Sequence, residues 1–370
     1  MKSSKGRKIC HITTVHNAKD TRIFQKECVS LAKHGFETHL IVANQKSEID
    51  QGVQIHNITS TTSGRLQRMR KTTQVAFEKA MEIDADIYHF HDPELLPVGS
   101  KLKKQGKKVI YDTHEDVPRQ ILSKYYLPSF IRPIVAGIFE IYENSISAKM
   151  DAIITATPFI RDRFLKINSN TVDVNNYPIF EKFNIEIPKE KIHDICYVGL
   201  MSKIRGIEEM IKMLEFTEAK MTLIGEFQSK EEETFIKNLP TWKKVNFLGK
   251  RNRKEVAKIL SQSKMGIVTF HPEPNHINAQ PNKIFEYMAA SLPIITSDFP
   301  LWKKIVAKHN AGICANPLVP KEIAKAVNVL LENEEQSIQM GKNGQKAVQE
   351  VFNWKQEEEK LIKLYEQILP

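Results

Sequence analysis

The 370-residue chain has only four cysteines, and no two of them stand close together. Cys10, Cys28, Cys196 and Cys314 form no Cys-x-x-Cys pair, and three of them lie in short apolar runs that are typical of strands. Cysteine-based zinc sites and disulfide frameworks both need closely spaced or numerous cysteines. The sequence therefore predicts free, mostly buried thiols, no disulfide framework and no metal site.

Long apolar runs are also missing. A helix needs about 20 mainly apolar residues to span a bilayer, and the best candidate run, at residues 131–142, is interrupted by Arg132, Pro133 and Glu140. The first eight residues are polar and basic, and the apolar run that follows is too short for the core of a secretory signal. We therefore expect a cytoplasmic protein that contacts a membrane, if at all, as a peripheral protein at the inner face of the cytoplasmic membrane.

The composition has neither the bias of a disordered chain nor that of a fibrous one. Hydrophobic residues make up 41% of the chain and charged residues 26%, with 15 glycines and 17 prolines. A chain of this length usually divides into two domains. The net charge is +10, and a basic surface attracts nucleic acid, anionic lipid and phosphorylated ligands alike, so the charge alone does not choose among them.

Short β-branched runs alternate with helical patterns, which predicts parallel sheets built from strand-helix-strand units. We expect strands at 8–14, 38–43, 53–58, 86–90, 108–112 and 151–156, and then at 194–199, 220–225, 245–248, 265–270, 293–297 and 312–315. The fold class is α/β, with two doubly wound, Rossmann-like domains at residues 1–178 and 192–353 and a linker at 179–191. The carboxyl ends of their strands should surround a central cleft. Residues 354–370 should form a C-terminal helix that returns to the first domain.

A polar loop at residues 271–281 leads into a helix that is expected to begin near Asn282. The first turn of a helix has free backbone N–H groups and a partial positive charge, so it is a natural phosphate site. Lys283 adds a full charge there, and Glu286, one turn further on, can accept two hydrogen bonds from a ribose. The same pattern also fits an ordinary amphipathic helix with a solvated lysine and glutamate.

Three other passages carry a recognisable pattern: YVGLMSKIRG at 197–206, MTLIG at 221–225 followed by VNFLGK at 245–250, and IYDTH at 110–114. With the loop and helix of 271–297, they make the chain resemble glycosyltransferase family 4, the retaining GT-B enzymes, over nearly its whole length. The runs HDPELLP at 91–97 and YDTHED at 111–116 resemble a bacterial branch of that family that is assigned to cell-surface polysaccharide assembly.

The resemblance implies an activity. A sugar would pass from a nucleotide-sugar donor, carrying UDP, GDP or another nucleotide, to a hydroxyl of a glycan or lipid-linked glycan. The anomeric configuration would be retained, and neither a metal ion nor another cofactor would be needed. The leaving diphosphate accumulates negative charge, so positioned cations and N–H groups should supply the catalysis. The base, the sugar, the acceptor and the oligomeric state remain open.

The resemblance also implies roles for single residues. Arg205 and Lys283 would neutralise the diphosphate, and Glu286 would hold the ribose. The full donor-binding set is Gly199, Arg205, Gln280, Asn282, Lys283 and Glu286. His114 would act as a catalytic residue near the transferred sugar, unless it is a structural histidine at a strand end.

The chain departs from the family pattern at three places. One is Leu200, where the family often has a basic residue, so Arg205 would carry the phosphate alone with Lys283. The family has two glutamates separated by seven residues, and Asn278 replaces the first of them. An amide can still bind sugar hydroxyls, so Asn278 stays in the predicted catalytic set, while Glu273, His276 and Gln280 are alternative substitutes. The usual glycine-rich first loop is replaced by residues 16–24, where Asp20 and Arg22 either form a structural pair or contact an acceptor.

Two segments are candidates for contact with an anionic membrane. Residues 64–81 predict a basic amphipathic helix whose charges come from Arg65, Arg68, Arg70 and Lys71, and such helices lie on anionic membrane surfaces. Residues 119–139 mix cations with aromatic side chains. The alternative is that both segments turn their apolar side chains toward the protein core.

Two other functions compete with glycosyl transfer. A nucleotide-sugar epimerase shares the two-domain architecture but would need acid-base carboxylates. A nucleic-acid-binding protein would explain the charge, but the sequence contains no recognisable binding module and no stacking aromatic platform. We therefore expect a nucleotide-sugar donor and a glycan or lipid-linked acceptor as partners, and no nucleic acid.

Overall fold

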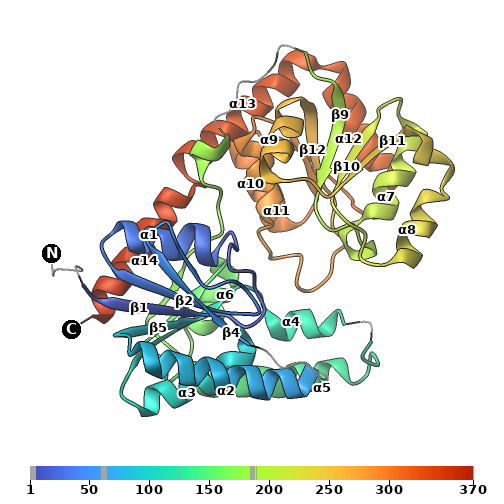
Figure 1. The fold of residues 1–370 in the computed structure, drawn as a ribbon. Helices are drawn as coiled ribbons and strands as arrows, with labels where there is room; N and C mark the ends of the chain where they lie inside the picture. Colours follow the sequence, from blue (N-terminus) through green and yellow to red (C-terminus); the bar gives the residue numbers. More distant parts are fainter. Residues whose placement is uncertain (1–5, 60–64, 125, 184–187, 189, 370) are drawn as a thin grey trace. The chain divides into compact units, whose positions relative to one another are not determined.

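The computed structural model describes residues 6–59, 65–124, 126–183, 188 and 190–369. The chain divides into two compact units, which are an N-terminal unit of Met1–Asn176 with Trp354–Pro370 and a C-terminal unit of Tyr177–Asn353 (Figure 1). Each unit is a sheet of mainly parallel strands with helices packed around it. The predicted α/β class with two doubly wound domains is confirmed.

The N-terminal sheet has eight strands in the described part of the unit, and all neighbours pair in parallel except β3 and β4 at one edge. The spatial order is β3 (Glu48–Asp50), β4 (Val53–Ile58), β2 (Glu37–Ala43), β1 (Lys8–Ile12), β5 (Ile87–Phe90), β6 (Lys108–Thr113), β7 (Ala152–Thr155) and β8 (Thr171–Asp173). Six of these strands lie within a few residues of the predicted ranges. The three-residue strands β3 and β8 were not predicted.

The helices of this unit connect the strands and cover the sheet. They are η1 (Ile23–Cys28), α1 (Val29–Lys33), α2 (Arg65–Ile83), η2 (Pro93–Leu95), α3 (Leu96–Lys104), α4 (Val117–Leu122), α5 (Arg132–Ser147), α6 (Pro158–Phe164) and α14 (Trp354–Ile368). Of these, η1 is a π-helix, a rare form that often occurs at functional sites. It lies against α14.

Alternate residues of one strand fill different cores, as the two-residue period of a strand requires. Leu40 and Val42 pack with Phe24 of η1, whereas Ile41 between them packs with Ala76 of α2. The sheet is therefore buried on both faces, with η1 and α1 on one and α2 on the other.

The C-terminal sheet has six parallel strands among the described residues. The order is β11 (Val245–Gly249), β10 (Met221–Ile224), β9 (His193–Val198), β12 (Ser263–Val268), β13 (Ile294–Ser297) and β14 (Gly312–Ala315). All six match predicted strands. The helices are η3 (Phe180–Phe183), η4 (Lys203–Arg205), α7 (Ile207–Lys212), η5 (Met213–Phe216), α8 (Lys230–Lys237), η6 (Pro240–Lys244), α9 (Arg253–Ser261), α10 (Asn282–Ala289), α11 (Pro300–His309), α12 (Pro320–Glu332) and α13 (Glu334–Glu350).

Each sheet has a point at which the order of its strands reverses. In the N-terminal unit, the chain runs outward from β1 through β2 to β4 and then returns to form β5 on the other side of β1. The C-terminal chain does the same with β9, β10 and β11 before β12. Open α/β sheets bind ligands beyond the carboxyl ends of their strands at such a switch point. A ligand site is therefore expected among the residues that follow β1, β5, β9 and β12.

No helix among the residues that the structure describes is both long enough and apolar enough to cross a bilayer.

Candidate functional site

The switch point of the C-terminal sheet brings together three residues of the predicted donor set. Gly199 directly follows β9 with a φ of +139°, and a methyl group placed on it would come within 2.4 Å of Lys283 Cε and 2.6 Å of Lys283 Nζ. Arg205 Nη1 lies 3.9 Å from the same point. Because Gly199 has no side chain, the Lys283 ammonium can occupy that space. Arg205 lies close to the same space.

The two cations are not neutralised by a shared carboxylate. The ammonium group of Lys283 is largely removed from water and close to the Arg205 guanidinium, and these effects lower the pKa of Lys283 to about 8. Glu286 acts in the opposite direction, but less strongly. Two positive groups held together with so little compensation favour an anionic ligand, which would stabilise both.

The backbone around Arg205 is fixed by close contacts. Gly206, with a φ of +73°, lies so near Thr269 that a Cβ atom would be 2.0 Å from the Thr269 carbonyl oxygen. The backbone N–H of His271 donates to the Ile204 carbonyl at 2.9 Å. The loop that carries Arg205 is thereby held against the loop that follows β12, with the guanidinium carbon 5.6 Å from the centre of the Phe270 ring.

Helix α10 is anchored to the sheet by Tyr287, a residue that the sequence analysis did not single out. The backbone N–H of Val198 donates to the Tyr287 hydroxyl at 2.8 Å, and the Tyr287 ring occupies the space beside Gly266, where a Cβ atom would be 2.3 Å from the ring. A glycine inside strand β12 was the available signal, because such a glycine often marks a close approach. Tyr287 thus sets the position of its neighbour Glu286 and of the start of the helix.

Helix α10 begins at Asn282, as predicted, with Pro281 before it. Asn282, Lys283 and Glu286 are half-buried, and within the described chain no hydrogen bond or ion pair engages the carboxylate of Glu286. The first backbone N–H groups, the Lys283 ammonium and the Glu286 carboxylate thus lie within one turn and a half of helix. This arrangement offers N–H groups and a cation to a phosphate and a carboxylate to a diol.

The loop that leads to α10 is held in place by side chains from elsewhere in the unit. Tyr177 donates its hydroxyl proton to Gln280 Oε1 at 2.8 Å, and the Trp302 indole N–H donates to the Ala279 carbonyl at 2.8 Å. Gln280 therefore helps to hold the loop in place. Its amide oxygen already accepts the Tyr177 hydroxyl proton, so it is less available to a ligand. Asn278 is half-buried between these anchors and, within the part of the chain that is described, has no hydrogen-bond partner.

The alternative substitutes for the missing glutamate differ in their surroundings. His276 is buried against Phe270, and its Nδ1 donates to the His271 carbonyl at 3.1 Å. Burial lowers the pKa of His276, so this side chain is neutral near pH 7. Glu273 is half-buried, and nothing in the local geometry gives it or Asn278 precedence.

His114 lies just beyond β6, beside the switch point of the N-terminal unit. Its Nε2 lies 2.9 Å from Asp112 Oδ2 and 3.1 Å from His91 Nδ1, and 18% of its side chain is exposed. Because the Asp112 carboxylate can only accept, Nε2 carries the proton and the lone pair of Nδ1 is left available to a ligand. The histidine is thus held by a carboxylate and remains reachable.

Arg22 determines the position of Asp112, and the predicted pairing of Asp20 with Arg22 takes a different form. The Arg22 guanidinium donates to both oxygens of Asp112, at 3.0 and 2.9 Å, and to the Val174 carbonyl at 2.7 Å. Asp20 Oδ1 instead accepts from the backbone N–H groups of Arg22 and Ile23 at the start of η1. Arg22 is buried, so it supports His114 through Asp112 rather than contacting an acceptor.

The four predicted basic residues lie on α2. Arg70 and Lys71 are exposed, whereas the side chains of Arg65 and Arg68 lie outside the described part of the structure. The apolar residues Ala76 and Ala80 of the same helix are fully buried in the core. The helix itself is confirmed, but its apolar face is occupied by the sheet.

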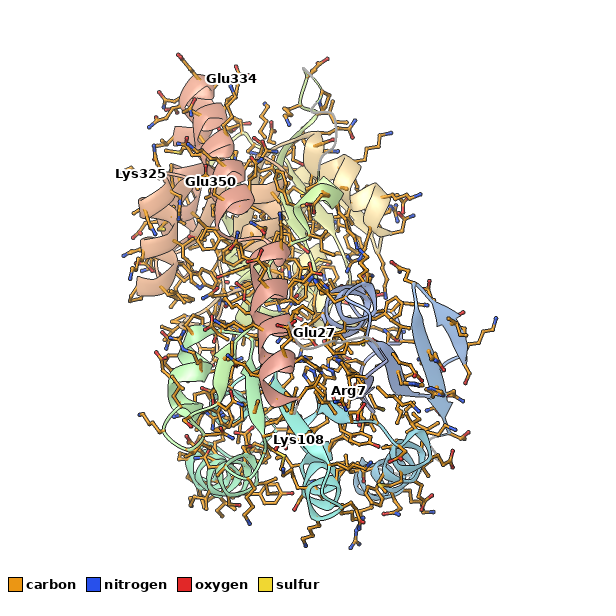
Figure 2. The ribbon with its side chains drawn as sticks, turned by 90° about the vertical axis from the view of Figure 1, so that its left-hand side faces the viewer. Arg7, Glu27, Lys108, Lys325, Glu334 and Glu350 are labelled. Carbon is orange, nitrogen blue, oxygen red and sulfur yellow. The ribbon has the colours of Figure 1, made fainter. Side chains whose placement is uncertain are left out.

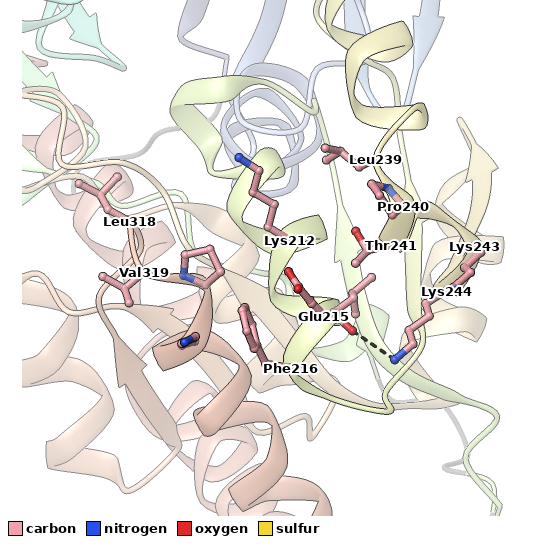
Figure 3. Close-up of a pocket in the computed structure, with 13 residues that line it drawn as sticks. Lys212, Glu215, Phe216, Leu239, Pro240, Thr241, Lys243, Lys244, Leu318 and Val319 are labelled. Carbon is pink, nitrogen blue, oxygen red and sulfur yellow. Dashed lines mark hydrogen bonds between the residues drawn. The ribbon is translucent and has the colours of Figure 1, made fainter.

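A separate cavity of about 750 Å³ in the C-terminal unit contains none of the predicted residues (Figure 3). It lies among η5, η6 and the residues that begin α12, and Lys244, one of its lining residues, donates to the Leu214 and Thr217 carbonyls. Since η5 and η6 directly precede β10 and β11, most of its lining comes from the amino ends of the strands rather than from the edge that carries Gly199 and Lys283.

Two family models match separate parts of the chain. The model described as "Glycosyl transferases group 1" matches residues 179–347, and the model described as "Glycosyltransferase Family 4" matches residues 21–174. Among curated proteins, the chain is similar to the D-rhamnosyltransferase WbpZ of Pseudomonas aeruginosa, with 22% identity over 282 residues that cover 74% of this chain and 71% of the relative.

Solved structures with the same fold cover almost the entire chain. Sucrose-phosphate synthase from Thermosynechococcus elongatus matches with a TM-score of 0.78 and 16% identity over 98% of this chain and 99% of its own. The Anabaena protein HepE, solved with UDP and glucose, matches with a TM-score of 0.72 and 15% identity over 98% and 100%. WaaG, described as a glycosyltransferase involved in lipopolysaccharide biosynthesis, matches with a TM-score of 0.73 and 11% identity over 96% and 99%.

Proposed function

Because the chain belongs to glycosyltransferase family 4, we propose that Lys283, Arg205 and the first turn of α10 bind the diphosphate of its nucleotide-sugar donor. Glu286 holds the ribose in this proposal, and Gly199 allows the donor to approach the backbone. The observation that carries the proposal is the pair of poorly compensated cations beside Gly199, whose mutual repulsion contributes to the low pKa of Lys283. The bound diphosphate would remove that repulsion.

The same cations serve the reaction. When the bond between the sugar and the diphosphate breaks, negative charge grows on the leaving group, and a cation held in advance stabilises it without reorganisation. His114 contributes its Nδ1 lone pair to a hydroxyl of the transferred sugar, with Asp112 and Arg22 fixing the ring. Asn278 binds a sugar hydroxyl through its amide in place of the usual glutamate. The reaction retains the anomeric configuration and needs no metal ion at the donor site.

A panel of nucleotides tests the donor site directly. UDP, GDP, ADP and their glucose or mannose derivatives are each added to the protein, and the melting temperature is measured, since a ligand that binds only the native state stabilises it by mass action. HepE was solved with UDP and with UDP-glucose, so we expect the UDP series to produce the largest shift. Absence of a shift with every nucleotide would remove the donor-site proposal.

The acceptor is a glycan or lipid-linked glycan of cell-surface polysaccharide in this proposal. Its support is the resemblance of residues 91–97 and 111–116 to that branch of the family and the names of WbpZ and WaaG. Deletion of the gene in its own host should change the surface polysaccharide profile on a gel, and a plasmid that carries Lys283→Met should fail to restore it.

We propose that α5 contacts the membrane, because the apolar face of α2 is buried in the core. Ile134, Ile138 and Ile141 recur at helical spacing along α5 and are 60%, 65% and 73% exposed. Helix α3 contacts both α5 and α2, and it adds the exposed Lys101 and Lys104 to Arg70 and Lys71 of α2. An exposed apolar stripe beside cations is the pattern of a surface that lies on anionic lipid.

Flotation with vesicles of phosphatidylglycerol and phosphatidylcholine tests this surface. The native protein should float with the anionic vesicles, and Ile134→Ser combined with Ile138→Ser and Ile141→Ser should stay at the bottom. Ile338→Ser, which changes a 50% exposed isoleucine of α13, is the matched control and should still float. Equal flotation of the triple variant and the control would rule out α5 as the contact.

A further inference from the structure

Four titratable side chains fill the switch point of the N-terminal unit beneath α14, and the donor site does not use them. His11 of β1 and His89 of β5 are partners in register, so they lie on the same face of the sheet, and His91 follows two residues later. Glu27 comes from the π-helix η1, close to α14 (Figure 2). All four side chains have no exposed surface.

The outward nitrogen of each histidine already has a partner. His91 Nδ1 lies 3.1 Å from Asp112 Oδ2. The Tyr365 hydroxyl of α14 lies 2.6 Å from His89 Nδ1 and 3.2 Å from His11 Nε2. Outer partners of this kind, a carboxylate or a hydroxyl on the remote ring nitrogen, orient histidines that bind metals.

The inward atoms, by contrast, form no hydrogen bond to a described side chain outside the cluster, although Asp112 Oδ2 lies 3.7 Å from His89 Nε2. His89 Nε2 and both carboxylate oxygens of Glu27 are buried without a hydrogen bond among the described residues. Glu27 Oε1 forms only an ion pair with Arg22, at 3.1 Å. Arg22 is also shared with Asp112, so one buried guanidinium serves two buried carboxylates, and unpaired buried groups of this kind need an explanation.

The distances among the inward atoms match the size of a metal ion. His11 Nδ1 and His91 Nε2 are 2.9 Å apart, and each lies 3.9 Å from Glu27 Oε2, so the point equidistant from the three atoms is about 2.1 Å from each, the length of a zinc–nitrogen or zinc–oxygen bond. One nitrogen of His89 lies within 4.8 Å of ligand atoms from the other three side chains.

We propose that the N-terminal unit binds one divalent transition-metal ion, zinc in the first place, through four buried side chains: His11, Glu27, His89 and His91. Three imidazoles and a carboxylate suit zinc and its neighbours better than magnesium or calcium. The ion joins β1, β5 and η1, and through His91 and Asp112 it fixes the base on which His114 rests. It plays no part in binding the donor, so this proposal is independent of the proposed function.

Metal content is the first test, and the native protein suffices for it. Protein made without a polyhistidine tag in zinc-supplemented medium is dialysed against metal-free buffer and analysed by mass spectrometry of its elements. Because the ligands are fully buried, the ion should survive dialysis at about one per chain. Unfolding in chelator and refolding with Co²⁺ should give visible d–d absorption, with ligands near 2.1 Å by X-ray absorption.

Two variants and a control sharpen the test. Tyr365→Phe removes only the hydroxyl that orients His11 and His89, and loss of such a partner weakens metal binding by about 10- to 100-fold. Glu27→Gln should weaken it at least as much. His56→Gln is the control, because His39 and His56 form another histidine pair, 2.8 Å apart on the same sheet, that belongs to no larger group of metal-ligating side chains among the described residues.

The outcomes separate clearly. Less than about a tenth of an ion per native chain, together with no Co²⁺ spectrum after refolding, would overturn the proposal and leave a cluster of hydrogen-bonded imidazoles. Equal metal affinity in the native protein, Tyr365→Phe and Glu27→Gln would also overturn it, since the ion would then lie elsewhere. If Glu27→Gln does not fold, the native spectrum and Tyr365→Phe decide the question.

Discussion

The two sheets use the same topological position in opposite ways. At the C-terminal switch point, between β9 and β12, the polar groups of Lys283, Arg205 and Glu286 are half-buried and incompletely paired. At the N-terminal switch point, between β1 and β5, the polar groups are fully buried and contact one another, from Arg22 through Asp112 to the histidines. The first set fits the ligand site proposed above, and the second forms a buried base for His114, which is 18% exposed.

This difference predicts which property each set controls. Substitutions at the N-terminal switch point should mainly lower the free energy of unfolding, because they leave buried charges without partners. Substitutions at the C-terminal switch point should mainly lower activity or affinity and leave stability nearly unchanged. The predictions below test that separation.

Asp112→Asn should have the largest effect. It leaves the buried Arg22 guanidinium without its main counter-charge, and breaking a buried ion pair in this way costs about 3–5 kcal/mol of unfolding free energy. Urea denaturation monitored by circular dichroism measures the loss. A change below 1 kcal/mol would contradict the idea that this network supports the N-terminal unit.

Lys283→Met should lower kcat/KM by about 10²–10³, the range seen when one group that stabilises a developing anion is removed. Its melting temperature should not fall, since a half-buried charge next to Arg205 is replaced by an apolar side chain. Lys303→Met is the matched control: this exposed lysine of the same unit pairs with Asp298 at 3.2 Å, and activity should persist. Equal activity in the two variants would place the diphosphate elsewhere.

Gly199→Ala should weaken nucleotide binding by about 10- to 100-fold. The new methyl group would displace the end of the Lys283 side chain, and a φ of +139° adds strain of roughly 1–3 kcal/mol. The effect on binding, measured by calorimetry, should largely disappear when Lys283→Met is already present, because the displaced group is gone. Additive losses in the double variant would show that the glycine acts independently of the lysine.

The affinity for the nucleoside diphosphate should fall about tenfold between pH 7 and pH 9. In the free protein Lys283 loses its proton as the pH rises through about 8, whereas the bound diphosphate keeps it protonated, so binding at high pH must also take up a proton. Calorimetry across this range measures the slope. Lys283→Arg should remove the dependence, since arginine stays charged; an unchanged slope in this variant would assign the titration to another group.

Glu286→Gln should have the smallest effect, about fivefold weaker binding of UDP, because an amide oxygen still accepts one hydrogen bond from the ribose. The free energy of unfolding should stay within about 0.5 kcal/mol of the native value, in contrast to Asp112→Asn. Binding of inorganic pyrophosphate, which lacks a ribose, should not change. A parallel loss for pyrophosphate would mean that Glu286 acts on the phosphates through Lys283.

The sequence predicted most of the framework because strands and helices leave a periodic signal. Twelve strands and the start of α10 at Asn282 lie where apolar runs and turn residues placed them. The missed strands, β3 at Glu48–Asp50 and β8 at Thr171–Asp173, have three residues each. A run so short and partly polar carries no detectable two-residue period.

The residues proposed for the donor site could be named from the sequence one by one, but their electrostatics could not. Lys283 and Arg205 are 78 positions apart, and their proximity depends on Gly199 and on the anchoring of α10 by Tyr287. The pairing of Arg22 with Asp112 spans 90 positions, so local spacing suggested Asp20 instead. The histidine cluster was overlooked for the same reason, because His11 and Glu27 lie far from His89 and His91 in the sequence. The sequence analysis looked for metal sites only in the spacing of cysteines.

The position of α14 bears on the order in which the newly made chain can fold. The helix supplies Tyr365 to the histidines and Trp354 to Ser30, with an indole N–H bond of 3.0 Å, yet it is translated after the entire C-terminal unit. The C-terminal unit is continuous and can close its core on the ribosome, whereas the N-terminal unit must wait for α14 although it is translated first. The histidines of the N-terminal unit are therefore uncovered while the C-terminal unit is being translated. A metal ion can reach them during that time.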